Sequence, residues 1–171
     1  MNYFTLPRVR VHGRAVIALL AIATGSTVIQ AQTLLSQKAL SNDAALSVVN
    51  GALQKCHADG YKISLTLLDA SGLIKIQVRG DGTGPHTLEH SRRKAYTALT
   101  IKRPSGETAK AWAASPNPPP AIEGTVAAQG GVPIKVGNDV IGAIGVSGAP
   151  GGEKDEACAA AGIATIAELL K

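Results

Sequence analysis

The chain contains 171 residues, of which 45% are hydrophobic and 3% aromatic, and its formal net charge at pH 7 is +5. A chain of this length buries roughly two thirds of its unfolded surface, which is enough for one hydrophobic core. Three of its seventeen basic residues and none of its twelve acidic ones lie within residues 1–31, so the remaining chain carries a net charge of only +2. Nucleic-acid binding requires a basic surface, and single strands also require aromatic side chains for stacking, so this composition excludes that function.

The first 31 residues have the three parts of a secretory signal peptide. A basic stretch with three arginines precedes an apolar run over residues 15–29 and the small residue Ala31. The apolar run is shorter than the roughly twenty residues that a bilayer-spanning helix needs. We therefore expect cleavage after Ala31, no retained membrane anchor, and a mature domain of residues 32–171 that is periplasmic or secreted.

A helix and a β-hairpin are predicted next. Apolar residues recur every three or four positions between Ser36 and Asp59, which is the period of a helix buried along one face, and Gly60 ends it. Residues 61–68 and 73–78 are rich in β-branched and apolar side chains, and the turn sequence Asp-Ala-Ser-Gly separates them. Two such runs around a tight turn predict a hairpin.

A glycine-rich loop and a second helix follow. Residues 79–85 contain three glycines and end in Pro85, which fits the first turn of a helix. Residues 86–101 then predict a helix that buries small and apolar side chains along one stripe. The helix ends at Arg103-Pro104, because the residue before a proline disfavours helical backbone angles.

The second half of the chain predicts a short helix, three strands and a last helix. Residues 108–114 favour a short helix, and the proline-rich segment after it can neither continue a helix nor donate to a sheet. Strands are predicted at residues 125–128, 132–136 and 140–146, and an acidic first turn opens a last helix over residues 153–170. This order indicates a single α+β domain with a five-stranded, mostly antiparallel sheet packed by helices.

Cys56 and Cys158 are the only cysteines of the chain. In an oxidising compartment outside the cytoplasm they could form a disulfide that closes a long loop. Two buried apolar thiols are the alternative, since free cysteine is among the most buried residue types. Two thiols at this separation make a poor zinc signature.

Three segments, taken in order, carry a resemblance to a known family: residues 79–85 followed by 93–98, residues 130–134, and residues 141–150. They resemble the exported haem-binding HbpS/GlcG family, which is related to the carboxy-terminal domain of the PduO adenosyltransferases. The resemblance covers nearly the whole mature chain. It implies a profilin-like domain that assembles into symmetric homo-oligomers and that, in several members, binds haem or a related tetrapyrrole with proposed roles in haem sensing or degradation.

A stripe of polar residues on the second predicted helix is a candidate haem site. His86, His90, Lys94 and Thr97 follow one another at spacings of four, four and three, so they share one side of the helix. Haem iron is most often held by a histidine, and Arg92, Arg93 and Lys94 could pair with the propionates. A solvated helix face is the alternative interpretation. The two histidines alone do not make a metal site, which needs a third and usually a fourth ligand.

The glycines next to the predicted strands are a possible second wall of this site. Gly130 and Gly131 mark a place where something approaches the backbone closely, either a flat macrocycle or a neighbouring helix or subunit. The other glycine-rich segments match neither the dinucleotide fingerprint nor the phosphate loop, and Ser147 is not part of a nucleophile elbow. The sequence thus shows no catalytic constellation.

The sequence therefore favours an exported, oligomeric haem-binding or tetrapyrrole-binding protein. Two other classes stay open: an enzyme or regulatory subunit acting on haem or a small metabolite in the same pocket, and an oligomeric scaffold that binds only protein. The residues expected to bind the cofactor are His86, His90, Arg93, Lys94, Thr97, Gly130 and Gly131.

Overall fold

A computed structural model describes residues 35–120 and 122–171, so the expected signal peptide lies outside the described residues. Residues 36–171 cluster as one compact unit. In chain order its elements are α1 (Asn42–Ala58), β1 (Ser64–Asp69), β2 (Ile74–Val78), α2 (Thr87–Ile101), α3 (Ser105–Ala114), β3 (Gly131–Val136), β4 (Asp139–Ser147), α4 (Gly152–Ala164) and a 3₁₀ turn at Ala167–Leu170. In the described part of the chain, no helix is long and apolar enough to cross a membrane.

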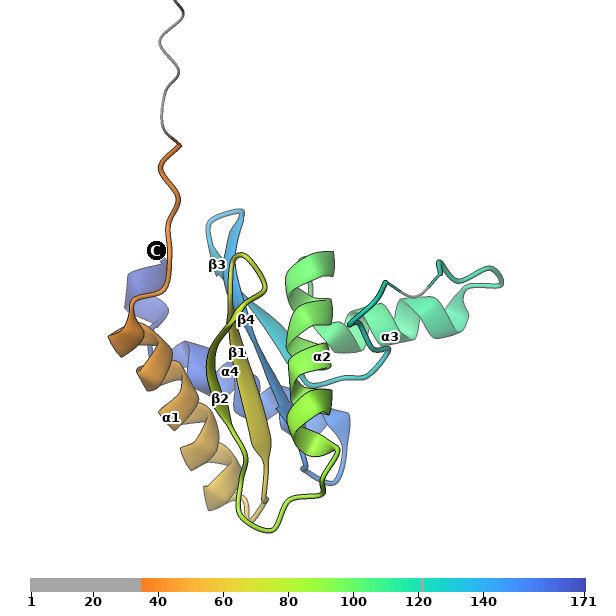
Figure 1. Cartoon of the computed structure of the whole chain (residues 1–171), viewed down its shortest axis with the longest axis horizontal. Coiled ribbons are helices and arrows are strands. Elements are labelled where there is room, and N and C mark those ends of the chain that lie inside the picture. The colour runs from red at the N-terminus through yellow and green to blue at the C-terminus, as the bar shows by residue number, and fades with distance from the viewer. Residues whose placement is uncertain (1–34, 121) are drawn as a thin grey trace, which may run out of the picture. The chain divides into compact units, whose positions relative to one another are not determined.

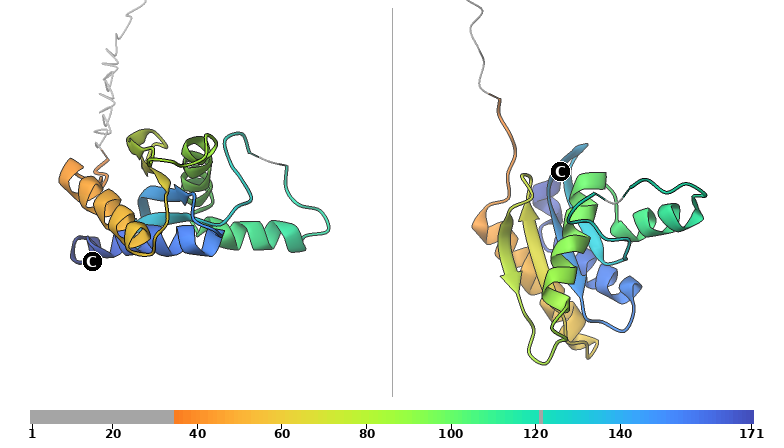
Figure 2. Two further views of the ribbon diagram at one scale, coloured as in Figure 1. Left: turned by 90° about the horizontal axis from the view of Figure 1, so that it is seen from below. Right: turned by 45° about the vertical axis from the view of Figure 1, so that its right-hand side comes forward.

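The strands form one antiparallel sheet in the order β2-β1-β4-β3. The α1 and α4 helices cover one face of this sheet and α2 covers the other, as Figures 1 and 2 show, while α3 projects away from the body. The predicted hairpin is confirmed as β1 and β2, which pair around a turn closed by Asp69. The α+β class and the antiparallel sheet are also confirmed.

The fifth strand predicted at residues 125–128 is wrong. Its backbone groups bond to helix side chains rather than to a strand: Thr97 Oγ1 accepts from Val126 N at 2.9 Å, and Ser105 Oγ donates to Ala128 O at 2.7 Å. Arg93 Nη2 also donates to Thr125 O. Because α2 and α3 satisfy these groups, the segment runs over the helices as irregular chain.

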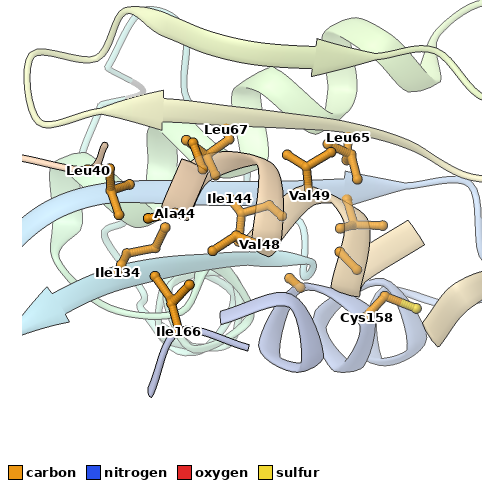
Figure 3. Packing of buried hydrophobic residues seen from close by; sticks show 14 of the residues in the cluster. Leu40, Ala44, Val48, Val49, Leu65, Leu67, Ile134, Ile144, Cys158 and Ile166 are labelled. Atoms are coloured by element: carbon orange, nitrogen blue, oxygen red, sulfur yellow. The ribbon is translucent and has the colours of Figure 1, made fainter. Parts of the chain in front are cut away.

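The core lies between the sheet and the α1–α4 layer. Leu65 and Leu67 of β1 alternate with polar residues, so they face the α1 side of the sheet. Val48 of α1 and Ile144 of β4 are fully buried members of the same core, as Figure 3 shows. A disulfide between Cys56 of α1 and Cys158 of α4 ties this layer together. Of the two possibilities that the sequence left open, the cysteines form the disulfide and are not two buried free thiols.

The opposite face of β1 is polar, and α2 packs closely against it. Ser64 Oγ and Thr66 Oγ1 each lie 2.8 Å from a hydroxyl oxygen of α2, those of Thr87 and Ser91. The neighbouring strand contributes Gly145, where an added Cβ would overlap the carbonyl oxygen of Ser91. The helix can therefore lie against the sheet backbone only because this position has no side chain.

Replacing Gly145 by Ala should destabilise the fold by about 1–3 kcal/mol, because the methyl group overpacks the contact between α2 and β4. Gly137→Ala is the matched control: Gly137 has no atom within 4 Å of an added Cβ, and its φ of 60° costs an alanine about 1 kcal/mol. Urea unfolding followed by circular dichroism measures both free energies of unfolding. Equal losses in the two variants would contradict the close packing of α2.

Candidate functional site

A cleft with a volume of about 380 Å³ opens at the end of the sheet where β1 begins and β4 ends. We call it the histidine cleft. Its walls are Lys62 before β1, the glycine-rich loop with the first turns of α2, and residues 147–152 between β4 and α4. The volume lies within the range of about 300–1,000 Å³ that is typical of small-molecule sites.

His86 and His90 lie one turn apart along α2, and both line the histidine cleft. Their ring centres are 6.3 Å apart, with the rings edge to face. His90 N donates to His86 O at 2.9 Å, and the hydroxyl of Thr87 donates to Gly84 O at 2.8 Å, which fixes the loop to the first turn. The spacing of four therefore presents both imidazoles to one cavity.

The environment of His90 favours a neutral imidazole. Partial burial lowers the pKa of His90 below the ordinary 6.5, and the positive charges of Lys94, His86 and Arg93 lower the pKa further. Only a neutral imidazole offers a nitrogen lone pair to a metal ion. His90 is therefore suited to coordination at neutral pH.

Lys94 and Asp155 form a buried ion pair that also lines the histidine cleft. Lys94 Nζ lies 2.7 Å from Asp155 Oδ2 and donates to Val146 O at 3.1 Å, and both side chains are only 4% exposed. Asp155 Oδ1 accepts a hydrogen bond from Ala149 N at 3.0 Å. Burial raises the pKa of Asp155, and the hydrogen bond from Lys94 opposes this. The pair thus joins α2, β4 and α4 beneath the cleft, and its lysine is already paired.

Lys94→Met should cost about 3–5 kcal/mol of stability, because it leaves the Asp155 carboxylate buried without a partner. The double variant Lys94→Met/Asp155→Leu should recover most of that loss, since no buried charge remains. Urea unfolding of the wild type and both variants measures the difference. A double variant as unstable as the single one would show that the ion pair is not the reason for the loss.

The two arginines expected near a ligand have partners within the chain. Arg92 forms a bidentate pair with Glu89, with both bonds at 2.8 Å. Arg93 Nη2 donates to Thr125 O on the irregular segment. Thr97 is fully buried and is hydrogen-bonded to Val126. None of these side chains lines the histidine cleft.

Gly130 and Gly131 lie behind the ion pair rather than in the cleft. An added Cβ at Gly131 would overlap the carbonyl oxygen of Lys94, and one at Gly130 would come within 2.9 Å of Lys94 Nζ. The close approach that the sequence indicated is therefore made by α2. Of the seven residues expected to bind a cofactor, the structure brings His86, His90 and Lys94 together in one cavity.

Sequence reasoning missed Lys62 and the loop of residues 147–152 as walls of this cleft. Lys62 precedes β1 without any motif, and the glycines of the loop match no known ligand-binding fingerprint. Their meeting depends on the pairing of β4 with β1, which places Ser147 opposite Ser64. Within residues 35–120 and 122–171, no three side chains of His, Cys, Asp or Glu are grouped to hold a metal ion.

The structure is an α+β domain with an antiparallel sheet between helical layers and a polar cleft at one end. Comparison with known proteins identifies the family. The family described as "Haem degrading protein HbpS-like" matches residues 40–164, so the chain belongs to the HbpS-like family. A comparison with curated protein sequences gave no match.

Solved structures agree with this assignment. A crystal structure of HbpS is 35% identical, with a TM-score of 0.73 over 80% of this chain and 97% of the other. A double mutant of HbpS from Streptomyces reticuli is 34% identical, with the same TM-score of 0.73 over 80% and 94% of the two chains. A complex of PduOC with heme, 23% identical, has a TM-score of 0.67 over 75% and 96%, which shows a shared fold.

Proposed function

We propose that this protein binds haem or a related tetrapyrrole in the histidine cleft and that it does so outside the cytoplasm. Membership of the HbpS-like family supports a haem-related function. The observation that carries the proposal is the His90 imidazole, which lines the cleft and has a lowered pKa. A histidine is the commonest protein ligand of haem iron.

The lining of the cleft fits part of what haem requires. His90 supplies an imidazole, with His86 beside it, and Lys62 supplies a cation that can pair with a propionate. Bound haem would bring the redox and ligand-binding chemistry of its iron to this cleft. The described lining contains one apolar side chain, Ala149, so it does not cover the apolar faces of a macrocycle. A homo-oligomer, in which a second copy covers the cleft, would supply that surface.

Titrating the assembled mature protein with hemin tests the binding proposal. We expect a saturable Soret shift, which His90→Ala should weaken by about tenfold or more, because the axial bond is lost. His86→Ala is the matched neighbour on the same helix and separates coordination by His90 from a general effect of removing an imidazole. A featureless titration of a well-folded protein would contradict haem binding, and a shift that survives His90→Ala would contradict His90 as the ligand.

Haem degradation, which the family description names, is the enzymatic alternative. Among the described residues of the cleft, the ionisable groups are the two histidines, Lys62 and the Lys94–Asp155 pair. Following the bound spectrum with a reductant or peroxide separates binding from degradation. A stable Soret band supports a binding protein, and progressive loss of the band supports the enzyme.

Export is supported by the disulfide between Cys56 and Cys158, because such bonds persist in oxidising compartments outside the cytoplasm. We expect the protein recovered from the extracytoplasmic fraction to begin at Gln32, with cleavage after Ala31. Intact mass and amino-terminal sequencing measure this. A cytoplasmic protein that keeps residues 1–31 would contradict the proposed export.

A further inference from the structure

A recess lies at the end of the sheet opposite the histidine cleft, where α2 ends beside the β1–β2 and β3–β4 turns, as Figure 1 shows. Two cavities of about 390 and 350 Å³ adjoin there, because Gln37, Lys102 and Val140 line both of them. We call the two cavities together the lysine groove. Each volume lies within the range that is typical of small-molecule sites.

Lys102, which lines both parts of the lysine groove, has an unusual backbone conformation. It caps the carboxyl end of α2 with φ 59° and ψ 27°, and among residues 35–120 and 122–171 it is the only non-glycine residue with a positive φ. Glycine is the usual residue at such a helix end, because a side chain is strained there. A lysine at this position therefore costs stability that a glycine would not, and strained residues are concentrated at functional sites.

The charged side chains of the lysine groove give it a net positive charge. Lys38 and Lys102 are exposed cations of the lining, and Asp139 is its acid. In the described part of the chain neither lysine forms an ion pair, whereas Lys94 in the histidine cleft is paired with a carboxylate. Both ammonium groups of the groove are thus free to bind a carboxylate by charge-assisted hydrogen bonds.

The part of the groove beside the β1–β2 turn adds an apolar surface next to these cations. Tyr96 and Leu99 lie one turn apart on α2, are partly buried, and line this part. A Cβ added at Gly72 would come within 3.1 Å of the Tyr96 ring and 3.6 Å of a Leu99 methyl group, so a side chain in the turn would cover both. The lack of one leaves an aromatic ring and a leucine open to the groove.

We propose that the lysine groove binds a small organic carboxylate with a planar apolar body, such as an aromatic acid. The body packs against Tyr96 and Leu99, and the carboxylate pairs with Lys102. Lys38 is the second cation of the site. The site does not depend on haem binding, because the lysine groove and the histidine cleft lie at opposite ends of the sheet and share none of their described lining residues.

Calorimetric titration of the assembled mature protein with benzoate tests the site. We expect saturable binding with a dissociation constant of about 1 mM or tighter. Benzamide keeps the ring without the charge, and acetate keeps the carboxylate without the ring, so each should bind about tenfold more weakly or worse. Saturation-transfer NMR, which detects magnetisation passing from protein to ligand, should show the ring protons of benzoate in contact with the protein.

Substitutions of Lys102 locate the site. Lys102→Gln should weaken benzoate binding about tenfold or more, and Lys102→Arg should retain the binding, because arginine preserves the cation. Lys110→Gln is the matched control, since Lys110 is an exposed lysine of α3 outside the groove. Lys102→Gly should abolish binding and raise the urea midpoint of unfolding, because glycine adopts the positive φ without strain. Circular dichroism confirms that each variant folds.

Benzoate affinity that is unchanged in Lys102→Gln, or that acetate and benzamide both match, would overturn the site. A lower urea midpoint in Lys102→Gly together with unchanged benzoate affinity would assign Lys102 to the fold alone, which also overturns it. The absence of saturable benzoate binding by the folded wild type has the same consequence. If Lys102→Gln then also changes the mass of the assembly in sedimentation, the groove is a contact between copies.

Discussion

The close contact between α2 and the sheet backbone is the constraint on which the rest of this structure depends. Gly145 and Gly131 leave room for the carbonyl oxygens of Ser91 and Lys94, and the hydroxyl pairs of β1 with Thr87 and Ser91 fill the interface. A helix held this way cannot rotate, because one side of it touches backbone. Its other positions are thereby assigned to fixed surroundings: Lys94 faces α4, and the two histidines face the open end of the sheet.

Much of the fold could be predicted from the sequence because local signals were strong. The apolar period of α1 and the turn at Asp69 predicted the helix and the hairpin. The structure begins α1 at Asn42 rather than near Ser36, because the Ser41 side chain caps Ala44 N. The strand predicted at residues 125–128 was wrong, because a short apolar run resembles a strand whereas the hydrogen bonds of this segment are made with α2 and α3. Strand pairing is a non-local choice that propensity does not decide.

The candidate site was predictable along one helix but not across the fold. Spacing alone placed His86, His90 and Lys94 on one side of α2. Spacing could not show that Arg92 and Arg93 are occupied by Glu89 and the Thr125 carbonyl, or that Lys94 has Asp155 as its partner. Those partners come from a neighbouring turn, from the irregular segment, and from a helix 61 residues away along the chain. Glycine is ambiguous for a similar reason: its absence of a side chain marks a close approach without saying what approaches.

The buried ion pair connects the stability of the fold to the chemistry of the cleft. Lys94 has a partner in Asp155, and its remaining positive potential still acts on His90 one turn earlier in α2, where it adds to burial in lowering the pKa of the imidazole. Asp155 in turn holds the amide of Ala149 and so fixes the loop that forms the far wall. A buried lysine that is already paired thereby helps to fix one wall of the cleft, and it adds to burial in favouring the neutral form of the His90 imidazole. Because Lys94 is paired, the cation left to meet a ligand among the described lining residues of the cleft is Lys62, which lies just before β1.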